Sequence, residues 1–338
     1  MRAYQLPKGG AGIDALVKAE RAEPKPQYRQ VKVKVAACSL NFRDLGIVRG
    51  TYRMPSKENV IPLSDGAGEV VEIGSGVTRV KVGNKVAGNF FARWPGGEPP
   101  SDVQSTALGG ATDGMLAEYV VLEEEGTVNL PAHLSLEEGA TLPCAAVTVW
   151  HAMMEHGKLI AGQSVLLQGT GGVSVFGLQL GHAMGMQTVI TSSSDAKLAK
   201  AKALGASRTI NYKTTPDWDK SAVEFTGGRG VDQVVEVGGA GTFAKSFGAI
   251  RVGGKISMIG NLSGPASELN PGLIMGRRAN IQGISVGSTQ MFEAMNRAIA
   301  ANAIKPVIDK VFGFDEAQAA YKHMASGANF GKIVIRMT

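Results

Sequence analysis

The chain has 338 residues, of which 44% are hydrophobic, and a formal net charge of +6. This length is enough for about two domains with substantial cores. The basic residues are scattered, so we expect no nucleic-acid partner. Because no apolar run reaches about 18 residues, we expect no membrane span. We also expect no secretion signal and no disulfide framework from two cysteines, which favours the cytoplasm.

The first 130 residues have the pattern of an antiparallel β-barrel. Apolar and polar residues alternate over Val31–Ala37, as they do in a half-buried strand. Between residues 60 and 91, glycine-containing turns interrupt short β-branched runs, which is typical of a barrel with tight turns. Residues 93–113 are rich in Gly, Pro and Ser and predict a surface loop, and Ala117–Leu122 returns to a strand pattern.

Residues 164–186 predict a strand, a glycine turn and a helix in succession. An apolar run at Val165–Leu167 is followed by Gly169, Thr170, Gly171 and Gly172, and helical spacing begins at Val173. In a dinucleotide-binding unit, such glycines allow a tight turn and let a pyrophosphate approach the backbone, where the N–H groups of the helix face its charge. The third glycine position holds Ser174, so we expect the helix to lie slightly further from the strand.

Alternating strands and helices continue on both sides of this turn. A helix is expected from Leu136, because Ser135 and Glu138 form a capping-box pattern. The other predicted strands are Gln187–Thr191, Arg208–Tyr212, Val231–Val237, Lys255–Gly260, Asn280–Ser285 and Lys332–Arg336, and the other predicted helices are Asp195–Leu204, Thr289–Ala301 and Asp315–Ser326. This alternation predicts an α/β fold with a doubly wound parallel sheet. We expect a first domain over residues 1–130, a nucleotide-binding domain over 131–287 and a tail, 288–338, that returns to the first domain.

The residues after the second strand of this sheet favour NADP(H) over NAD(H). An NAD-binding unit usually carries an acid about 20 residues after the glycines, where it binds the ribose 2′-hydroxyl. Here that region holds Ser192, Ser193 and Ser194, with Lys197 one turn later. Hydroxyls and a lysine attract a 2′-phosphate, whereas a carboxylate repels it. The alternative is that the serines only cap the following helix.

Several strings resemble the medium-chain dehydrogenase/reductase superfamily, and most of all its zinc-free branch of quinone oxidoreductases and zinc-independent alcohol dehydrogenases. The strings are SLNFRDLGIVRGTY (39–52), PLSDGAGEVVEIGSGV (62–77), LPCAAVTVWHAM (142–153), GTGGVS (169–174), KALGA (202–206) and FGKIVI (330–335). The resemblance spans the full length. It implies a GroES-like catalytic domain, a Rossmann domain, a cleft between them for the nicotinamide, and a homodimer.

The same resemblance argues against zinc. Zinc-dependent relatives carry ligands at three places that correspond here to Asn41-Phe42, Ser64-Asp65 and Cys144. Only the cysteine is kept, and an amide, a hydroxyl and one thiolate form a poor set for tetrahedral Zn²⁺. We therefore expect no metal, with Cys144 as a packed residue and Asp65 as a buried hydrogen-bonding residue.

Without a metal, side-chain donors must polarise the substrate carbonyl. By resemblance, the catalytic candidates are Asn41, Arg43, Asp44 and Tyr52. Asn41 and Tyr52 are the candidate donors, Arg43 stabilises charge, and Asp44 orients Arg43 or relays a proton. The alternatives are a helix-start residue for Asp44 and an aromatic residue that closes the loop edge for Tyr52.

The remaining candidates for cofactor binding come from strand ends and from the resemblance. Residues that follow the fourth and fifth strands are candidates because ligands bind at the carboxyl ends of parallel strands. These are Val237, Gly238, Ile259, Gly260 and Asn261, joined by Tyr212 after the third strand and, by resemblance, by Thr148, Phe330 and Lys332.

Three functions are compatible with these residues. The first is an NADPH-dependent reductase of quinones or α,β-unsaturated carbonyls, and the second is a zinc-independent alcohol dehydrogenase or carbonyl reductase with the same cofactor. The third is a non-catalytic, crystallin-like NADPH-binding protein, since fold does not determine function. In the first two cases the partner is a small carbonyl, enone, quinone or alcohol.

Overall fold

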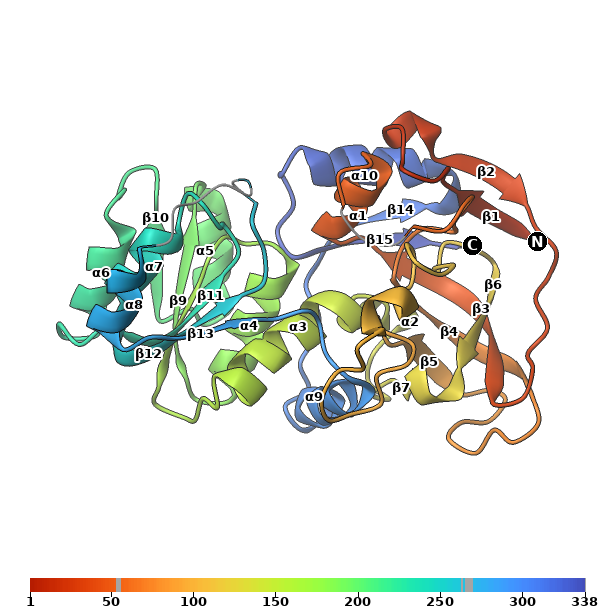
Figure 1. The fold of residues 1–338 in the computed structure, drawn as a ribbon, viewed down its shortest axis with the longest axis horizontal. Coiled ribbons are helices and arrows are strands. Elements are labelled where there is room, and N and C mark those ends of the chain that lie inside the picture. Colours follow the sequence, from red (N-terminus) through yellow and green to blue (C-terminus); the bar gives the residue numbers. More distant parts are fainter. Residues whose placement is uncertain (53–55, 263, 265–269, 338) are drawn as a thin grey trace. The chain divides into compact units, whose positions relative to one another are not determined.

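A computed structural model describes residues 1–338 except 53–55, 263, 265–269 and 338. The chain divides into two compact units, shown in Figure 1. The first comprises Met1–Val147 and Val286–Thr338, and the second comprises Thr148–Ser285. The sequence analysis placed the boundaries after residues 130 and 287, whereas the two units divide after Val147 and after Ser285. Among the described residues, none of the helices has the length and apolar character needed to cross a membrane.

The first unit is built on a seven-stranded sheet with the order β14-β15-β3-β4-β5-β7, in which β6 also pairs with β3. Its strands are β3 (Gln30–Ser39), β4 (Asp65–Ile73), β5 (Lys85–Gly88), β6 (Tyr119–Glu123), β7 (Thr127–Asn129), β14 (Ile308–Gly313) and β15 (Lys332–Arg336), and β1 (Arg2–Gln5) and β2 (Val17–Glu20) form a separate pair. All pairs except β14–β15 are antiparallel. The last strand of the chain thus borders β3, one of the first.

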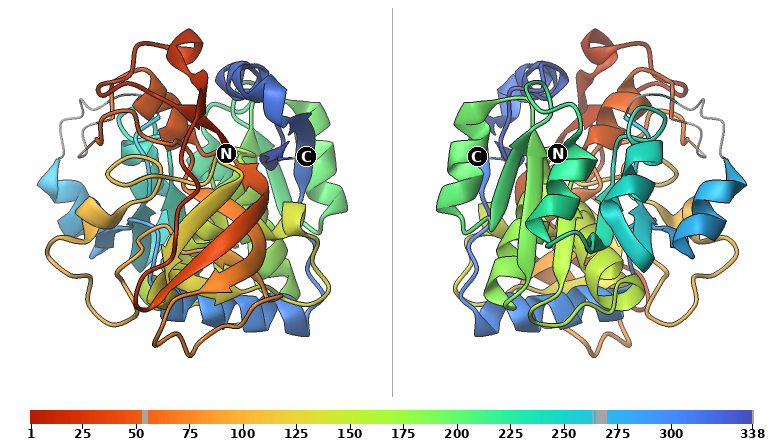
Figure 2. Two further views of the ribbon diagram at one scale, coloured as in Figure 1. Left: turned by 90° about the vertical axis from the view of Figure 1, so that its right-hand side faces the viewer. Right: turned by 90° about the vertical axis from the view of Figure 1, so that its left-hand side faces the viewer.

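The alternating pattern of β3 buries one face of the strand in the core of this unit. Val31, Val33 and Val35 are at most 3% exposed and belong to one cluster of buried residues. Lys32, expected on the exposed face, is also buried, because Glu23 and Glu72 form ion pairs with its ammonium. The left view of Figure 2 shows the twist of these strands.

The helices of the first unit lie in its loops and in its C-terminal part. They are α1 (Phe42–Val48), α2 (Leu136–Gly139), α3 (Val147–Trp150, which spans the division), α9 (Thr289–Ala301) and α10 (Ala317–Ala325). The capping box before α2 is confirmed: Glu138 N–H donates to Ser135 Oγ, and Ser135 N–H donates to the Glu138 carboxylate. The helix expected to follow continues in π-helical form at Leu142–Ala146 and at His151–His156, around α3. Pro143 lacks the N–H that an α-helical hydrogen bond needs.

The second unit contains a six-stranded sheet in which every pair is parallel. Its order is β10-β9-β8-β11-β12-β13, so the chain reverses direction across the sheet between β8 and β11. Its strands are β8 (Ser164–Leu167), β9 (Gln187–Ser192), β10 (Arg208–Asn211), β11 (Val231–Glu236), β12 (Ile250–Met258) and β13 (Asn280–Gly283), and its helices are α4 (Gly172–Ala183), α5 (Asp195–Ala203), α6 (Trp218–Phe225), α7 (Phe243–Ala249) and α8 (Pro271–Arg277). Figure 1 shows α4 on one side of the sheet and α7 and α8 on the other. The predicted α/β fold, with a doubly wound parallel sheet in one unit and a mostly antiparallel sheet in the other, is confirmed.

Candidate active site

The glycine turn follows β8 at the point where the strand order reverses, which is where open parallel sheets bind ligands. Gly169 has φ of 72°, a left-handed conformation that favours glycine. Its N–H donates to Thr191 Oγ1, at 3.2 Å, which joins the turn to the end of β9. Ser174, which stands at the third glycine position, is buried and donates from Oγ to the Gln168 carbonyl oxygen at 2.6 Å.

The start of α4 fits the phosphate groups of a dinucleotide. A Cβ built on Gly171 would meet nothing within 4 Å, so the space beside this backbone is open. Gly171 is the N-cap residue and has no side chain to accept from the first N–H groups of the helix. An anion is the partner that such N–H groups and the helix dipole favour. Gly172 and Val173 form the first turn, and Thr170 is buried beside it.

The close approach of α4 to the sheet depends on a glycine that the sequence analysis did not single out. A Cβ on Gly177 would lie 2.7 Å from Leu167 Cδ2 and 2.9 Å from Val149 Cγ2. The sequence could have indicated Gly177, because a glycine inside an otherwise apolar helical run is often required by close packing.

The serines after β9 both cap the next helix and surround the candidate 2′-phosphate site. Ser194 Oγ accepts from Lys197 N–H at 3.4 Å, and Ser192 Oγ accepts from Ser194 N–H at 3.3 Å. Asp195, the nearby acid, accepts from Asn211 Nδ2 at 2.7 Å. Ser193 is half-buried, and the ring of Tyr212, whose N–H donates to Ser192 O, is 42% exposed. The capping alternative and the cofactor prediction therefore involve the same residues.

Two buried polar side chains that the sequence analysis missed organise the loop after β11. Gln168 Oε1 accepts from Val237 N–H and Gly238 N–H at 3.1 and 3.2 Å, and its Nε2 donates to Glu236 at 2.7 Å. The fully buried Glu236 carboxylate also accepts from Gly238 N–H and from three further donors, which are Gly239 N–H, Thr242 Oγ1 and Ser246 Oγ. Both residues lie at the carboxyl ends of strands, where parallel sheets bind ligands. This position is the feature of the sequence that could have identified them.

These contacts bring most of the predicted cofactor residues to one edge of the second unit. Ile259 N–H donates to Glu236 O, and a Cβ on Gly260 would lie 3.0 Å from Val237 O. Asn261 is exposed and lies against Gly239. Thr148, which is buried, opens this unit at its other end in sequence.

In the first unit, three strands bring Asn41, Asp44, Asp65 and Lys332 together. Asn41 follows β3, whose last residue pairs with Asp65 of β4 on one side and with Val334 of β15 on the other. Asp44 accepts from Asn41 N–H at 2.7 Å at the start of α1, which is the helix-start arrangement named above as the alternative. Burial raises the pKa of Asp44 to about 6, against the opposing effects of Arg43 and the Asn41 N–H.

Lys332 belongs to this buried cluster. Its Nζ donates to Asn41 Oδ1 at 2.6 Å and to Leu40 O at 2.7 Å, and lies 3.6 Å from Asp65 Oδ2. Asp65 is fully buried and accepts from Ser64 Oγ and Cys144 N–H, as the prediction of a buried hydrogen-bonding residue requires. Phe330, two residues earlier, is buried in the same unit, where its N–H donates to Asp309 Oδ1.

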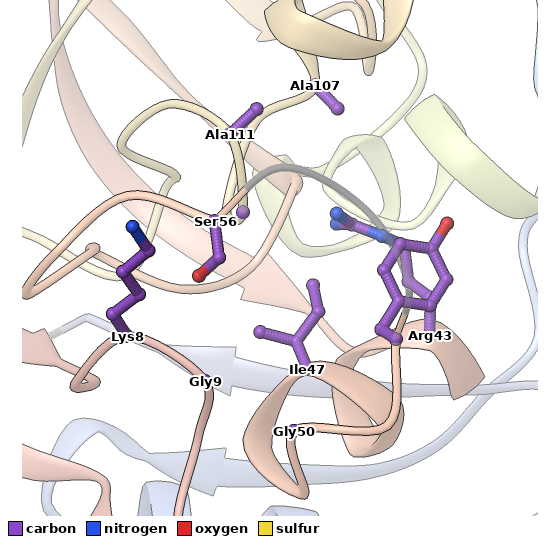
Figure 3. A pocket seen from close by; sticks show the side chains of 10 residues that line it. Lys8, Gly9, Arg43, Ile47, Gly50, Ser56, Ala107 and Ala111 are labelled. Atoms are coloured by element: carbon purple, nitrogen blue, oxygen red, sulfur yellow. The ribbon is translucent and has the colours of Figure 1, made fainter.

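A pocket of about 460 Å³ in the first unit is lined by Arg43 and Tyr52. Figure 3 shows Lys8 and Ser56 on one side of it, Arg43 on the other and Ile47 between them. The Arg43 guanidinium lies over the rings of Phe90 and Tyr52, at 4.6 and 5.2 Å, and donates to Leu108 O at 3.0 Å. Its stacked position and buried surroundings make it a fixed positive charge at the pocket wall.

The residues at the three zinc-ligand places do not fit zinc. Asn41 Oδ1 and Asp65 Oδ2 already face the Lys332 ammonium, so a metal ion there would meet a second cation. Burial, together with Asp65, raises the pKa of the Cys144 thiol well above its ordinary value, which disfavours the thiolate that zinc needs. Across the described part of the chain, no three His, Cys, Asp or Glu side chains gather as a metal site.

Comparison with known proteins assigns the family. Residues 27–132 match the alcohol dehydrogenase GroES-like domain, and residues 172–301 match the family described as zinc-binding dehydrogenase. A zinc-type alcohol dehydrogenase-like protein of Schizosaccharomyces pombe is 44% identical over 335 residues, which cover 97% of this chain and 96% of the relative. The chain belongs to the medium-chain dehydrogenase/reductase superfamily.

Further relatives agree with an oxidoreductase of this superfamily. A chloroplastic quinone-oxidoreductase homologue of Spinacia oleracea is 29% identical, with 99% of this chain and 98% of the relative covered. The crystal structure of an NAD-dependent alcohol dehydrogenase superposes with a TM-score of 0.89 at 29% identity, with both chains fully covered. The chain is therefore an oxidoreductase of the medium-chain dehydrogenase/reductase type.

Proposed function

We propose that this chain is a zinc-independent, NADP(H)-dependent reductase of quinones or α,β-unsaturated carbonyls. One observation carries the proposal: the Asn41 Nδ2 group is buried and has no hydrogen-bond partner among the described residues, at a place where zinc-dependent relatives hold their metal. A buried amide donor without an acceptor is costly, by about 1–3 kcal/mol, and calls for an explanation. An oxygen atom of a substrate supplies the missing acceptor.

The cofactor would be held by the second unit. Gly169, Gly171 and Gly172 would bind the pyrophosphate, and Ser193 and Lys197 the 2′-phosphate. When bound, NADPH supplies the hydride. The loop after β11, which Gln168 and Glu236 hold in place, would provide further contacts at the carboxyl edge of the sheet.

The first unit supplies the groups that act on the substrate. Asn41 Nδ2 donates to the oxygen that becomes negative, and the Arg43 charge stabilises it further. Arg43 and Tyr52 line one pocket of the first unit, and Tyr52 can donate from its hydroxyl group. Asp44, with a pKa of about 6, can hold or release a proton near neutral pH. A pocket of about 460 Å³ is large enough for a quinone ring.

The second candidate is a zinc-independent alcohol dehydrogenase or carbonyl reductase. The relative in Schizosaccharomyces pombe, with its alcohol dehydrogenase-like name, favours it. NADPH oxidation with a quinone, an enone and a simple aldehyde separates the two: turnover of the quinone or enone supports the reductase, and turnover of the aldehyde alone supports the dehydrogenase. Cofactor binding without any turnover would support the non-catalytic alternative. We also propose a homodimer, which light scattering tests.

The cofactor preference has a matched test on one helix. Lys197→Glu places a negative charge beside the proposed 2′-phosphate site, so we expect NADPH affinity to fall at least about tenfold while NADH affinity changes little. Lys200→Glu makes the same charge change on the exposed surface of α5 and is the control. Calorimetric titration of each variant with both nucleotides measures the effect. Tighter binding of NADH than NADPH by the native protein would contradict the proposed preference.

A further inference from the structure

A lysine from the last strand holds the Asn41 side chain. Lys332 opens β15, which pairs antiparallel with β3, so its side chain reaches the residues that follow β3. Its Nζ donates to Asn41 Oδ1 at 2.6 Å, across 291 residues of sequence, and to Leu40 O at 2.7 Å. The side chain is 3% exposed, so water does not compete for these hydrogen bonds.

Asp65 offsets part of the free energy that burial of the Lys332 ammonium costs. It lies on β4, the other neighbour of β3, and its Oδ2 atom is 3.6 Å from Lys332 Nζ. An isolated ammonium in such an environment would lose its hydration without compensation, at a cost of several kcal/mol. The opposite charge of Asp65 and the two carbonyl oxygens together replace that hydration. The lysine is therefore fixed in position by Asp65 on β4 and by the two residues that follow β3.

The chemistry of the ammonium decides which way the Asn41 amide faces. A protonated lysine has three donors and no acceptor, so it can bind the amide only through Oδ1. Nδ2 must then point away from Lys332, and it is this atom that is buried without a hydrogen-bond partner in the part of the chain that the structure describes. Without the lysine, the amide could turn about its Cα–Cβ and Cβ–Cγ bonds and present Oδ1 in place of the donor.

We propose that Lys332 is a positioning residue, which orients Asn41 so that Nδ2 donates to the substrate oxygen. The inference rests on the proposed function, because it assigns Lys332 a role in carbonyl polarisation. In this role Lys332 acts through Asn41, the residue to which its ammonium donates.

A double-mutant cycle tests the proposal. Asn41→Ala removes the donor, and we expect kcat to fall about 100-fold. Lys332→Met keeps the length of the side chain and loses its charge, and we expect kcat to fall at least about tenfold with NADPH affinity within about twofold of native. In the Asn41→Ala protein, Lys332→Met should cause no further loss of kcat. Independent, additive losses would overturn the proposal, and so would a loss of NADPH affinity as large as the loss in kcat.

A second variant allows for the effect of an unpaired buried carboxylate on folding. Lys332→Met combined with Asp65→Asn removes both charges of this pair, so neither is left buried without the other. The combination should fold and show the same loss of kcat as Lys332→Met. A combined variant with native kcat would show that Lys332 only neutralises Asp65, and the proposal would fail.

Neutron diffraction on the native protein gives a readout that needs no activity. It distinguishes the deuterated Nδ2 group of Asn41 from Oδ1, which X-rays rarely do. We expect a deuteron of Lys332 Nζ to point at Oδ1 and the Nδ2 deuterons to point away from it. The reverse orientation would refute the inference. If the protein shows no turnover with any acceptor, the proposed function fails, and the neutron structure still decides whether Lys332 orients the amide.

Discussion

Replacing Asp44 by asparagine should stabilise the first unit at neutral pH. Asp44 is 2% exposed, and burial raises its pKa from 3.8 to about 6. The native protein therefore holds this proton more tightly than the unfolded chain does. The stability gained from it is complete below the ordinary pKa of an aspartate and is lost as the pH rises through about 6. The asparagine side chain would resemble the protonated acid, and its Oδ1 can still accept from Asn41 N–H.

The pKa shift sets the size of the effect. A shift of about 2 units corresponds to about 3 kcal/mol, at about 1.4 kcal/mol per unit. We expect Asp44→Asn to exceed the native protein in free energy of unfolding by less than about 1 kcal/mol at pH 4 and by about 3 kcal/mol at pH 8. Hydrogen exchange of the β3 peptide in increasing urea reports this free energy for the first unit alone.

An exposed aspartate provides the control for this measurement. Asp102 is 62% exposed and pairs with Arg93 at 3.0 Å, so Asp102→Asn should change the stability by less than about 1 kcal/mol at either pH. If Asp44→Asn were equally destabilised at pH 4 and at pH 8, the buried carboxyl would not carry the raised pKa, and its role in proton transfer near neutral pH would lose its support.

Two further predictions concern the second unit. Gly171→Ala should keep the free energy of unfolding within about 0.5 kcal/mol of native and weaken NADPH binding at least tenfold. Gly177→Ala, whose Cβ would lie 2.7 Å from Leu167 Cδ2, should instead lower the free energy of unfolding by about 1–3 kcal/mol and leave the NADPH affinity of the folded protein unchanged. Calorimetric titration measures the NADPH affinity, and urea unfolding measures the free energy of unfolding. Equal losses of affinity in the two variants would contradict the proposed pyrophosphate site at the start of α4. Burial alone would raise the pKa of Asp232, but hydrogen bonds from two arginines and Ser164 hold this pKa well below its ordinary value. The contribution of Asp232 to the free energy of unfolding is therefore full above about pH 4 and is lost as the pH falls further. Asp232→Asn should cost about 3–5 kcal/mol at pH 7, measured by exchange of the β11 peptide in urea, and no change would refute this.

The elements whose hydrophobic pattern is local were predictable from the sequence. The helix over Thr289–Ala301 and the strand over Lys332–Arg336 have the bounds that periodicity predicts. The observed bounds of an element differ from the predicted ones where tertiary structure overrides the hydrophobic pattern. β12 begins at Ile250 rather than Lys255, because its pairing with β11 contains a shift in register between Ile250 and Lys255. The sequence of a single strand does not indicate such a shift in register with its neighbour.

The candidate site was predictable to the extent that its residues lie in one segment. The glycine turn and the serines after β9 are contiguous signals, and the resemblance located Asn41. The contact between Asn41 and Lys332 joins residues 291 positions apart, and only the pairing of β15 with β3 reveals it. Gln168 and Glu236 were missed because a polar residue at the end of an apolar strand does not by itself show what it binds.

The place of β15 beside β3 affects how the chain folds during synthesis. A ribosome that has made β3 must add nearly 300 further residues before β15 emerges, whereas β4 and β6 follow much sooner. Until then, the Ala37–Ser39 end of β3 offers unpaired backbone groups on one edge to any other extended chain, which is a known route to aggregation. This end of β3 therefore stays open to mispairing until the last strand has been made and closes the sheet.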